Sequence, residues 1–188
     1  MTYLSTPTES PLYQVDQAAL GYIPNYTRVF ALRPEVYGGW RQLNDAVKAG
    51  MDQRRYELAT LAAARSLGSN YCSLAHVAVL RDRFYDGAAL RAIAVDYHDA
   101  ALDPADVAVM DFAERVAAEP ASVTGVDAEN LRRNGLSDVD IFQVVLAACV
   151  RRFFSGVLTA VGAVPDAVGL DPGLLAALGL HGIENASQ

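Results

Sequence analysis

Apolar stretches rich in alanine and leucine alternate with short polar, proline or glycine breaks along this chain of 188 residues. Apolar stretches rich in alanine and leucine that lack the alternating pattern of strands predict helices. Proline or a capping residue opens several of them, and glycine closes others. The fold is therefore expected to be all-α, with orthogonal or bundle-like helix packing. Helices are predicted at residues 25–32, 35–49, 54–67, 70–85, 88–97, 104–118 and 122–134, and from Ser137 through Phe154.

The same pattern predicts a single helical domain at residues 21–170, between two flanking segments. Residues 1–20 contain Pro7 and Pro11 and are expected to form an extended N-terminal arm. Residues 171–188 are expected to form a C-terminal tail with one short helix and a polar end. The apolar run 140–164 contains Arg151 and Arg152 near its middle, which predicts a buried core helix and no membrane span.

Candidate chemistry is concentrated in the stretch ELATLAAARSLGSNYCSLAH, residues 57–76, where Cys72 precedes His76 by four positions. On a helix this spacing leaves the two side chains only about 40° apart. Gly68 suits the end of one helix, and Ser69 or Asn70 the N-cap of the next, so that Cys72 falls in a first turn. Free N–H groups and the helix dipole favour a thiolate there. The pattern predicts an activated sulfur nucleophile; an inert core thiol is the competing interpretation.

Glu57 is the only acidic residue between Asp52 and Asp82, the segment that contains this pair. It falls on the preceding antiparallel helix, among apolar residues, where a carboxylate needs a partner. His76 or Cys72 is one candidate partner. Pairing with a nearby arginine is the alternative, and the sequence leaves it open; the candidates are Arg54, Arg55 and Arg81.

The string Glu57-x11-Ser69-x2-Cys72-x3-His76 resembles the motif Glu-x11-Cys-x2-Cys-x3-His of the carboxymuconolactone decarboxylase superfamily, in its alkyl hydroperoxidase D-like, peroxidase-related branch. The phrases GYIPNYTRVFALRPEVYGGWRQL and LRRNGLSDVDIFQVVLAA also look like that family, and the resemblance covers roughly residues 20–165. Ser69 stands where the family has its first cysteine. Since two cysteines cycle between dithiol and disulfide in the family site, the resemblance leaves the resolving role vacant.

The resemblance implies an all-α domain of the alkyl hydroperoxidase D-like type in which Cys72 attacks a hydroperoxide and His76 and Glu57 relay protons. The thiolate would become a sulfenic acid, which an external thiol would reduce. Three alternatives stay open. One is a non-redox enzyme that uses Glu57 and His76 as acid and base on a small carbonyl compound. The others are a degenerate member acting as a binding or oligomeric scaffold, and a different Cys72-dependent reaction.

Three further residues, Ser69, Tyr71 and Cys149, each have two interpretations. Ser69 is either only a helix cap or a hydrogen-bonding group for the substrate peroxide or the sulfenate. Tyr71 either lines a substrate pocket or packs outward. Cys149 lacks a neighbouring base and is expected in the core. Whether it can resolve Cys72 depends on a distance that the sequence does not give.

Composition narrows the classes of partner. The net charge is −7, and no basic stripe compensates for it, which argues against a nucleic-acid partner. The paired arginines at 54–55, 132–133 and 151–152 are expected on solvated helix faces or in salt bridges. The sequence shows no phosphate loop and no metal-ligand cluster, so neither a cofactor nor a metal is expected. It also shows no signal peptide, so a cytoplasmic location is expected. The family resemblance implies a small-molecule substrate and a homo-oligomer, commonly a trimer or hexamer.

Overall fold

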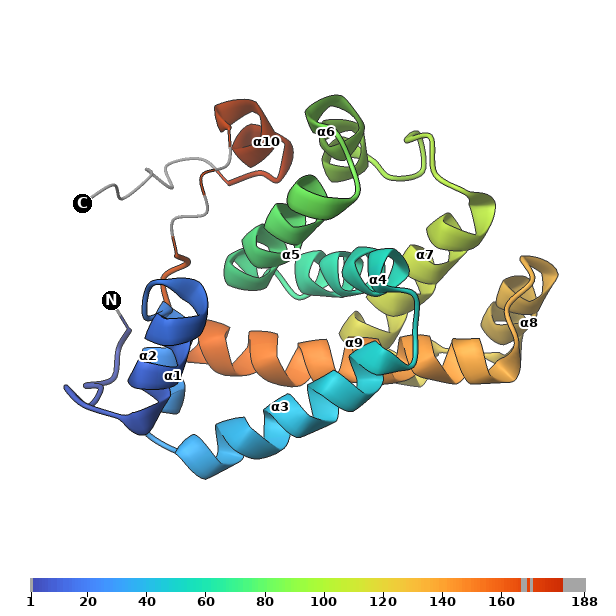
Figure 1. Ribbon diagram of the computed structural model, residues 1–188. Helices are drawn as coiled ribbons and strands as arrows, with labels where there is room; N and C mark the ends of the chain where they lie inside the picture. The colour runs from blue at the N-terminus through green and yellow to red at the C-terminus, as the bar shows by residue number, and fades with distance from the viewer. Residues whose placement is uncertain (1, 167–168, 170, 181–188) are drawn as a thin grey trace.

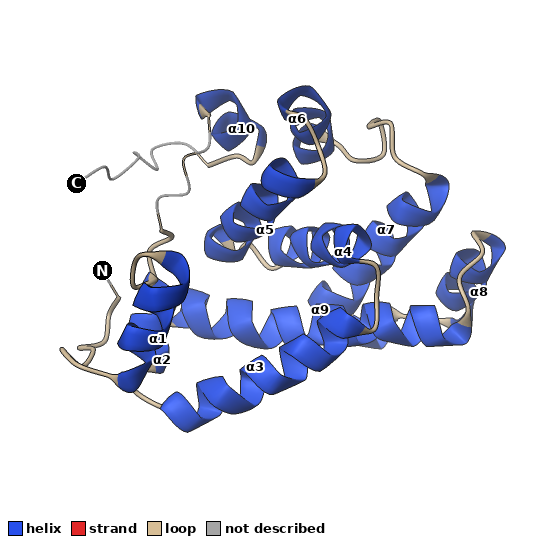
Figure 2. Ribbon diagram, viewed as in Figure 1, coloured by secondary structure: helices blue, strands red, loops and turns tan. Residues whose placement is uncertain are grey.

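The computed structural model describes residues 2–166, 169 and 171–180, and within these residues it contains ten α-helices, one 3₁₀ helix and no strand (Figure 2). The all-α prediction is therefore confirmed. The α-helices, labelled in Figure 1, are α1 (Pro11–Leu20), α2 (Asn25–Phe30), α3 (Pro34–Ala49), α4 (Gln53–Ser66), α5 (Asn70–Arg83), α6 (Gly87–Val95), α7 (Pro104–Ala118), α8 (Gly125–Arg133), α9 (Asp138–Ala160) and α10 (Pro172–Ala177). The 3₁₀ helix η1 (Pro120–Ser122) lies between α7 and α8 in sequence.

Helix α4 lies at the centre and contacts α3, α5, α7 and α9 (Figure 1). Every residue from Tyr56 to Ala64 is buried, as expected for a helix that is apolar on all sides. The small side chains of its alanines let the neighbouring helices α5, α7 and α9 pack closely around it. The polar residues Glu57 and Thr60 are buried with the rest, so the centre of the fold contains polar groups that need partners.

The α4–α5 junction follows the sequence prediction closely. Asp52 caps α4 by accepting a hydrogen bond from the Arg55 N–H at 2.9 Å. Gly68 follows the helix with φ +63°, a left-handed conformation that glycine adopts without strain. Helix α5 then begins, with Ser69 at its N-cap position. This turn brings α5 back against α4.

Two local predictions differ from the structure. The N-terminal arm is not extended throughout, because Pro11–Leu20 forms α1, capped by the Ser10 side chain and packed against α2. The stretch 122–134 is not one helix: a 3₁₀ turn ends at Ser122, and α8 begins only after the Thr124 capping box. The short tail helix is present as α10, whereas residues 181–188 of the tail lie outside the described residues.

Helix α9 is the described helix that is long and apolar enough to cross a membrane by length and composition. Half of its most apolar window is buried inside the protein, and it packs against α3, α4, α5, α7 and α8. A core helix of a globular domain has these properties. Its arginine Arg151 is buried, so the prediction that this arginine lies on a solvated face or in a salt bridge is wrong for Arg151.

Candidate active site

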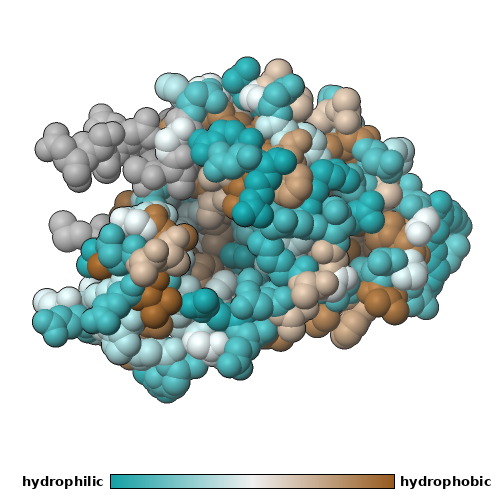
Figure 3. All heavy atoms as spheres, in the orientation of Figure 1, coloured by the Kyte–Doolittle hydropathy of each residue, from teal (hydrophilic) through white to brown (hydrophobic). Residues whose placement is uncertain are grey.

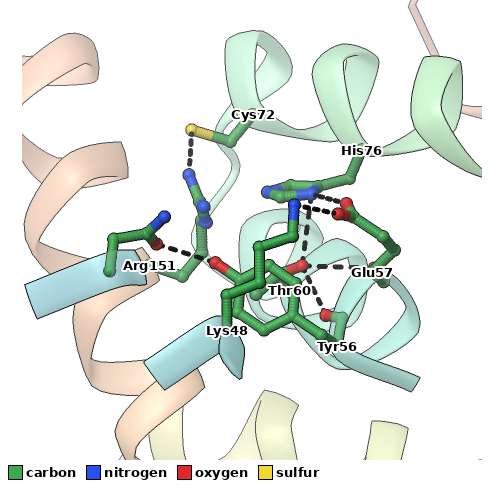
Figure 4. A network of polar contacts seen from close by, with 8 residues as sticks. Lys48, Tyr56, Glu57, Thr60, Cys72, His76 and Arg151 are labelled. Carbon is green, nitrogen blue, oxygen red and sulfur yellow. Dashed lines mark hydrogen bonds and ion pairs between the residues drawn. The ribbon is translucent and has the colours of Figure 1, made fainter. Parts of the chain in front are cut away.

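The thiol lies where the first turn of α5 meets α4 and α9 (Figure 4). Cys72 is the third residue of α5 and is only 1% exposed; His76 follows one turn later and is 7% exposed. The sequence thus placed both side chains correctly on one helix. Among the described residues no hydrogen bond joins the two, and the sulfur instead accepts one from Arg151.

Glu57 connects α4 to the imidazole. Its Oε2 lies 2.6 Å from His76 Nδ1, and its Oε1 lies 3.1 Å from Lys48 Nζ on α3. Burial raises the pKa of Glu57, but the charges and hydrogen bonds of His76 and Lys48 outweigh it and lower the pKa to about 2. The alternative pairing of Glu57 with arginine is wrong, since Arg54 and Arg55 bind Asp106 and Arg81 binds Asp82.

The ionised carboxylate determines the tautomer of His76. Because Glu57 can only accept, Nδ1 carries the proton and donates it, which leaves a lone pair on Nε2. Burial and the charge of Arg151 lower the pKa of His76, so the ring is neutral at pH 7. Nε2 is buried and has no hydrogen-bond partner in the described part of the chain. It is therefore available as a base.

Arg151 is the site residue that the sequence reasoning missed. It comes from α9, is 5% exposed, and points Nη1 at Cys72 Sγ from 3.6 Å (Figure 4). Its guanidinium also lies 5.6 Å from the centre of the Phe154 ring. A cation beside sulfur favours the thiolate. The only sequence signal was an arginine inside an apolar run, which does not say what the arginine faces.

Aromatic rings pack on the other side of the thiol. Cys72 belongs to a buried cluster with Phe30, Tyr37, Tyr71 and Phe154. Of the two interpretations of Tyr71, outward packing is wrong: the side chain is buried and its hydroxyl donates to Asp166 while accepting the Tyr26 N–H at 3.1 Å. Figure 3 shows a hollow on this face between the α1–α2 pair and α5.

The remaining candidates lie apart from the proton relay. Ser69 occupies the N-cap position, but its side chain caps nothing; the hydroxyl is buried and has no partner among the described residues. Cys149 is exposed, so the core prediction is wrong. It precedes Arg151 by two residues, about 200° around α9, and so faces away from the Cys72 side of that helix. In the described residues no group of three or more His, Cys, Asp or Glu side chains could hold a metal ion.

Residues 34–115 match the family model described as the carboxymuconolactone decarboxylase family. No curated protein matches the chain in sequence at a significant level. Among solved structures, a peroxidase-related protein with an alkylhydroperoxidase AhpD core from Ralstonia eutropha JMP134 has 23% identity and a TM-score of 0.79, over 94% of this chain and 96% of the other. A peroxidase-related protein from Silicibacter sp. TM1040 has the same identity and TM-score, over 88% and 92%.

A further similar structure is the debrominase Bmp8, in a cysteine-to-alanine variant bound to 2,3,4-tribromopyrrole. It has 14% identity and a TM-score of 0.73, over 94% of this chain and 96% of the other. These likenesses to solved structures establish an AhpD-like all-α fold over nearly the whole chain.

Proposed function

Because residues 34–115 match the carboxymuconolactone decarboxylase family model and the chain has the AhpD-like fold, we propose that it is a member of that superfamily and a thiol-dependent peroxidase that reduces a small hydroperoxide at Cys72. The observation that carries the proposal is the surroundings of the sulfur. Cys72 Sγ lies at a helix start, 3.6 Å from a buried guanidinium, on the helix face that also presents an unpaired imidazole nitrogen. Each of these features favours a thiolate.

The first step moves the thiol proton to Nε2 of His76. The imidazolium that forms is stabilised by Glu57, whose carboxylate already accepts the Nδ1 proton at 2.6 Å. Arg151 holds the sulfur anion through Nη1. This requires a small movement of Cys72 or His76 to bring sulfur and nitrogen into hydrogen-bond reach, which catalytic pairs often make only when substrate is bound.

The thiolate then attacks the terminal oxygen of the hydroperoxide. The S–O bond forms as the O–O bond breaks; sulfur is oxidised to sulfenic acid, and the leaving alkoxide takes the proton from His76 Nε2 to become the alcohol. A low-molecular-weight thiol condenses with the sulfenic acid and releases water, and a second thiol releases Cys72. An external reductant is needed because Ser69 cannot form a disulfide and Cys149 faces away from this site.

Stoichiometric hydroperoxide followed by dimedone trapping and mass spectrometry tests the proposal. We expect the adduct on Cys72 in the wild type and in Cys149→Ser, and none in Cys72→Ser. We also expect the rate of adduct formation to fall roughly a hundredfold in His76→Ala, the scale of a lost general base. An unmodified Cys72 in a folded protein would exclude the peroxidase.

Two other reactions have some support. The Glu57–His76 pair is complete without the thiol, which suits acid–base chemistry on a carbonyl compound; in that case Cys72→Ser would retain turnover. The aromatic cluster beside Cys72 suits a planar substrate, as the debrominase likeness also suggests. Thiol-dependent removal of bromide from a bromopyrrole, lost in Cys72→Ser, would identify that reaction. A scaffold would show neither activity nor rapid Cys72 alkylation.

A further inference from the structure

Several polar groups around Cys72 are buried without a hydrogen-bond partner in the described part of the chain. Two of them are Ser69 Oγ at the N-cap of α5 and His76 Nε2 on α5, and both residues lie on the helix face of the thiol. Two others, on α9, are Arg151 Nε and Ser155 Oγ, one turn apart on a common face. All four side chains are at least 93% buried, since their exposed fractions range from 1% to 7%.

A fifth such group comes from α3. The indole nitrogen of Trp40 is buried without a partner, and its ring stacks on Phe154 at 4.1 Å between centroids. The same Phe154 ring lies under the Arg151 guanidinium. Trp40 and Arg151 thus share the Phe154 ring as a packing partner, and each has a buried nitrogen without a hydrogen-bond partner among the described residues.

These groups are mostly hydrogen-bond donors. The Nε atoms of Arg151 and Trp40 donate only, and a serine hydroxyl can donate; only His76 Nε2 needs a donor. A buried unpaired polar group costs about 1–3 kcal/mol, and a charged one costs more. A set of unpaired donors is therefore completed best by a ligand that brings acceptor oxygens.

The charge of Arg151 sets the sign of that ligand. Among the described residues no carboxylate forms an ion pair with it, because Glu57 already serves Lys48 and His76. Nη1 faces the sulfur, whereas Nε remains without an acceptor. While Cys72 is protonated, the site holds a buried cation without an anion, and an entering carboxylate balances it.

We propose that the Cys72 site takes substrates bearing a carboxylate, which the unpartnered Nε of Arg151 holds while the apolar part lies against the aromatic cluster. This inference rests on the proposed function, for which it names the substrate class: a hydroperoxide with a carboxylate group. The carboxylate is unchanged in the reaction. It positions the O–O bond at the sulfur and supplies the acceptors that the buried donors lack.

Two alkylating reagents of similar size test this directly, since iodoacetate carries a carboxylate and iodoacetamide does not. The measured quantity is the ratio of their rates at Cys72, with free N-acetylcysteine under the same conditions as the reference. We expect the ratio at Cys72 to exceed that of the free thiol by roughly tenfold, the equivalent of a charge-assisted hydrogen bond, and the iodoacetate rate to saturate. An equal or lower ratio at a Cys72 that iodoacetamide modifies overturns the proposal.

Variants assign the effect to one arginine. Arg151→Met keeps length and apolar packing and should abolish the preference for iodoacetate, while Arg151→Lys should retain part of it. Arg152→Met is the matched control, because Arg152 is adjacent but exposed, and it should behave as wild type. A preference that survives Arg151→Met would contradict the assignment.

A binding measurement covers the case in which Cys72 reacts with neither reagent. Trp40 is the only tryptophan, so its fluorescence reports on the site. Benzoate should change it saturably in wild type but not in Arg151→Met, and benzamide should have no such effect. Absence of a benzoate response overturns the inference. Because no peroxide is involved, benzoate binding alongside a peroxide-resistant Cys72 would contradict the peroxidase alone.

Discussion

At the scale of single residues, the carboxylate of Glu57 and the guanidinium of Arg151 are kept apart because each has different partners. Glu57 satisfies Lys48 and fixes the His76 tautomer, and Arg151 is left for sulfur and substrate. If Arg151 also paired with Glu57, the carboxylate would neutralise the cation that the thiolate needs. Lys48, half-buried on α3, therefore has a function in the site although it touches neither Cys72 nor His76 in the described contacts.

Glu57→Gln should destabilise the protein at neutral pH by roughly 3 kcal/mol, because it removes a buried charge from two partners. The pKa of Glu57 in the folded protein, about 2, lies below its ordinary value of 4.5. Its stabilisation is therefore complete above pH 4.5 and is lost as pH falls toward 2. Urea unfolding of both proteins at pH 7 and pH 3 should show the difference shrinking.

Glu35→Gln is the matched control for this experiment. Glu35 also has a lowered pKa and pairs with Arg33, but it is fully exposed, and exposed pairs contribute little. It should unfold like wild type at both pH values. A pH-independent loss of stability in Glu57→Gln would mean that the side chain acts through packing and not through its charge.

The site could be predicted from the sequence as far as local geometry reaches. Cys72 and His76 share a face because a helix dictates it, and Glu57 meets His76 because a short turn folds α4 back on α5. Arg151 is 79 positions from Cys72. Which face of α9 turns toward α5 depends on how α9 packs against five other helices, and the pattern of a single sequence does not predict that packing.

At the scale of elements, the first turn of α5 has Ser69 and Cys72 at the positions where the motif that the sequence resembles has two cysteines. Ser69 and Cys72 stand at N-cap and N3, three residues apart, where Cβ atoms lie about 5–6 Å from each other. Disulfides need a slightly closer approach, which a helix N-terminus permits. Since the Ser69 hydroxyl caps nothing, the helix does not depend on it.

Ser69→Cys should therefore fold and should form a disulfide with Cys72 after one equivalent of hydroperoxide. Thiol titration and peptide mapping would detect the pair, and dimedone would trap less sulfenic acid than in wild type. A dithiol such as dithiothreitol should then regenerate the enzyme. Ser66→Cys, one turn earlier on α4 with an exposed side chain, is the control. Persistent sulfenic acid in Ser69→Cys would show that the two positions cannot approach.

Element boundaries followed the sequence wherever capping chemistry was explicit. Pro34, Asp103 with Pro104, and Ser137 begin helices in the structure as they do in the pattern. The same capping signals are present at α1, where Ser10 is the N-cap and Pro11 the first helical residue. The segment was nevertheless predicted as extended because of the surrounding serines and threonines. The division of the chain at residues 20 and 170 stays a prediction.

At the scale of the whole molecule, one surface is unusually apolar. Helices α3 and α9 form a groove of about 420 Å³ whose lining includes Val36, Trp40, Leu43, Cys149 and Phe153. Leu43 and Phe153 are 53% and 45% exposed. Apolar surface of this kind marks an interaction site. Trp40 belongs both to this groove and to the aromatic stack over Phe154, so a protein bound here would contact the wall of the Cys72 site.

We expect a second copy of the chain to cover this groove, in keeping with the homo-oligomer that the family resemblance implies. Light scattering after size-exclusion chromatography should give a multiple of 20.1 kDa for wild type. Leu43→Glu and Phe153→Glu should shift it toward the monomer, because each buries a charge in an apolar contact. Val126→Glu, an equally apolar but isolated position on α8, should leave the mass unchanged. A wild type that is monomeric at all concentrations would exclude the contact. A Phe153→Glu monomer with an altered rate of Cys72 alkylation would show that the neighbouring copy helps to shape the site through Trp40.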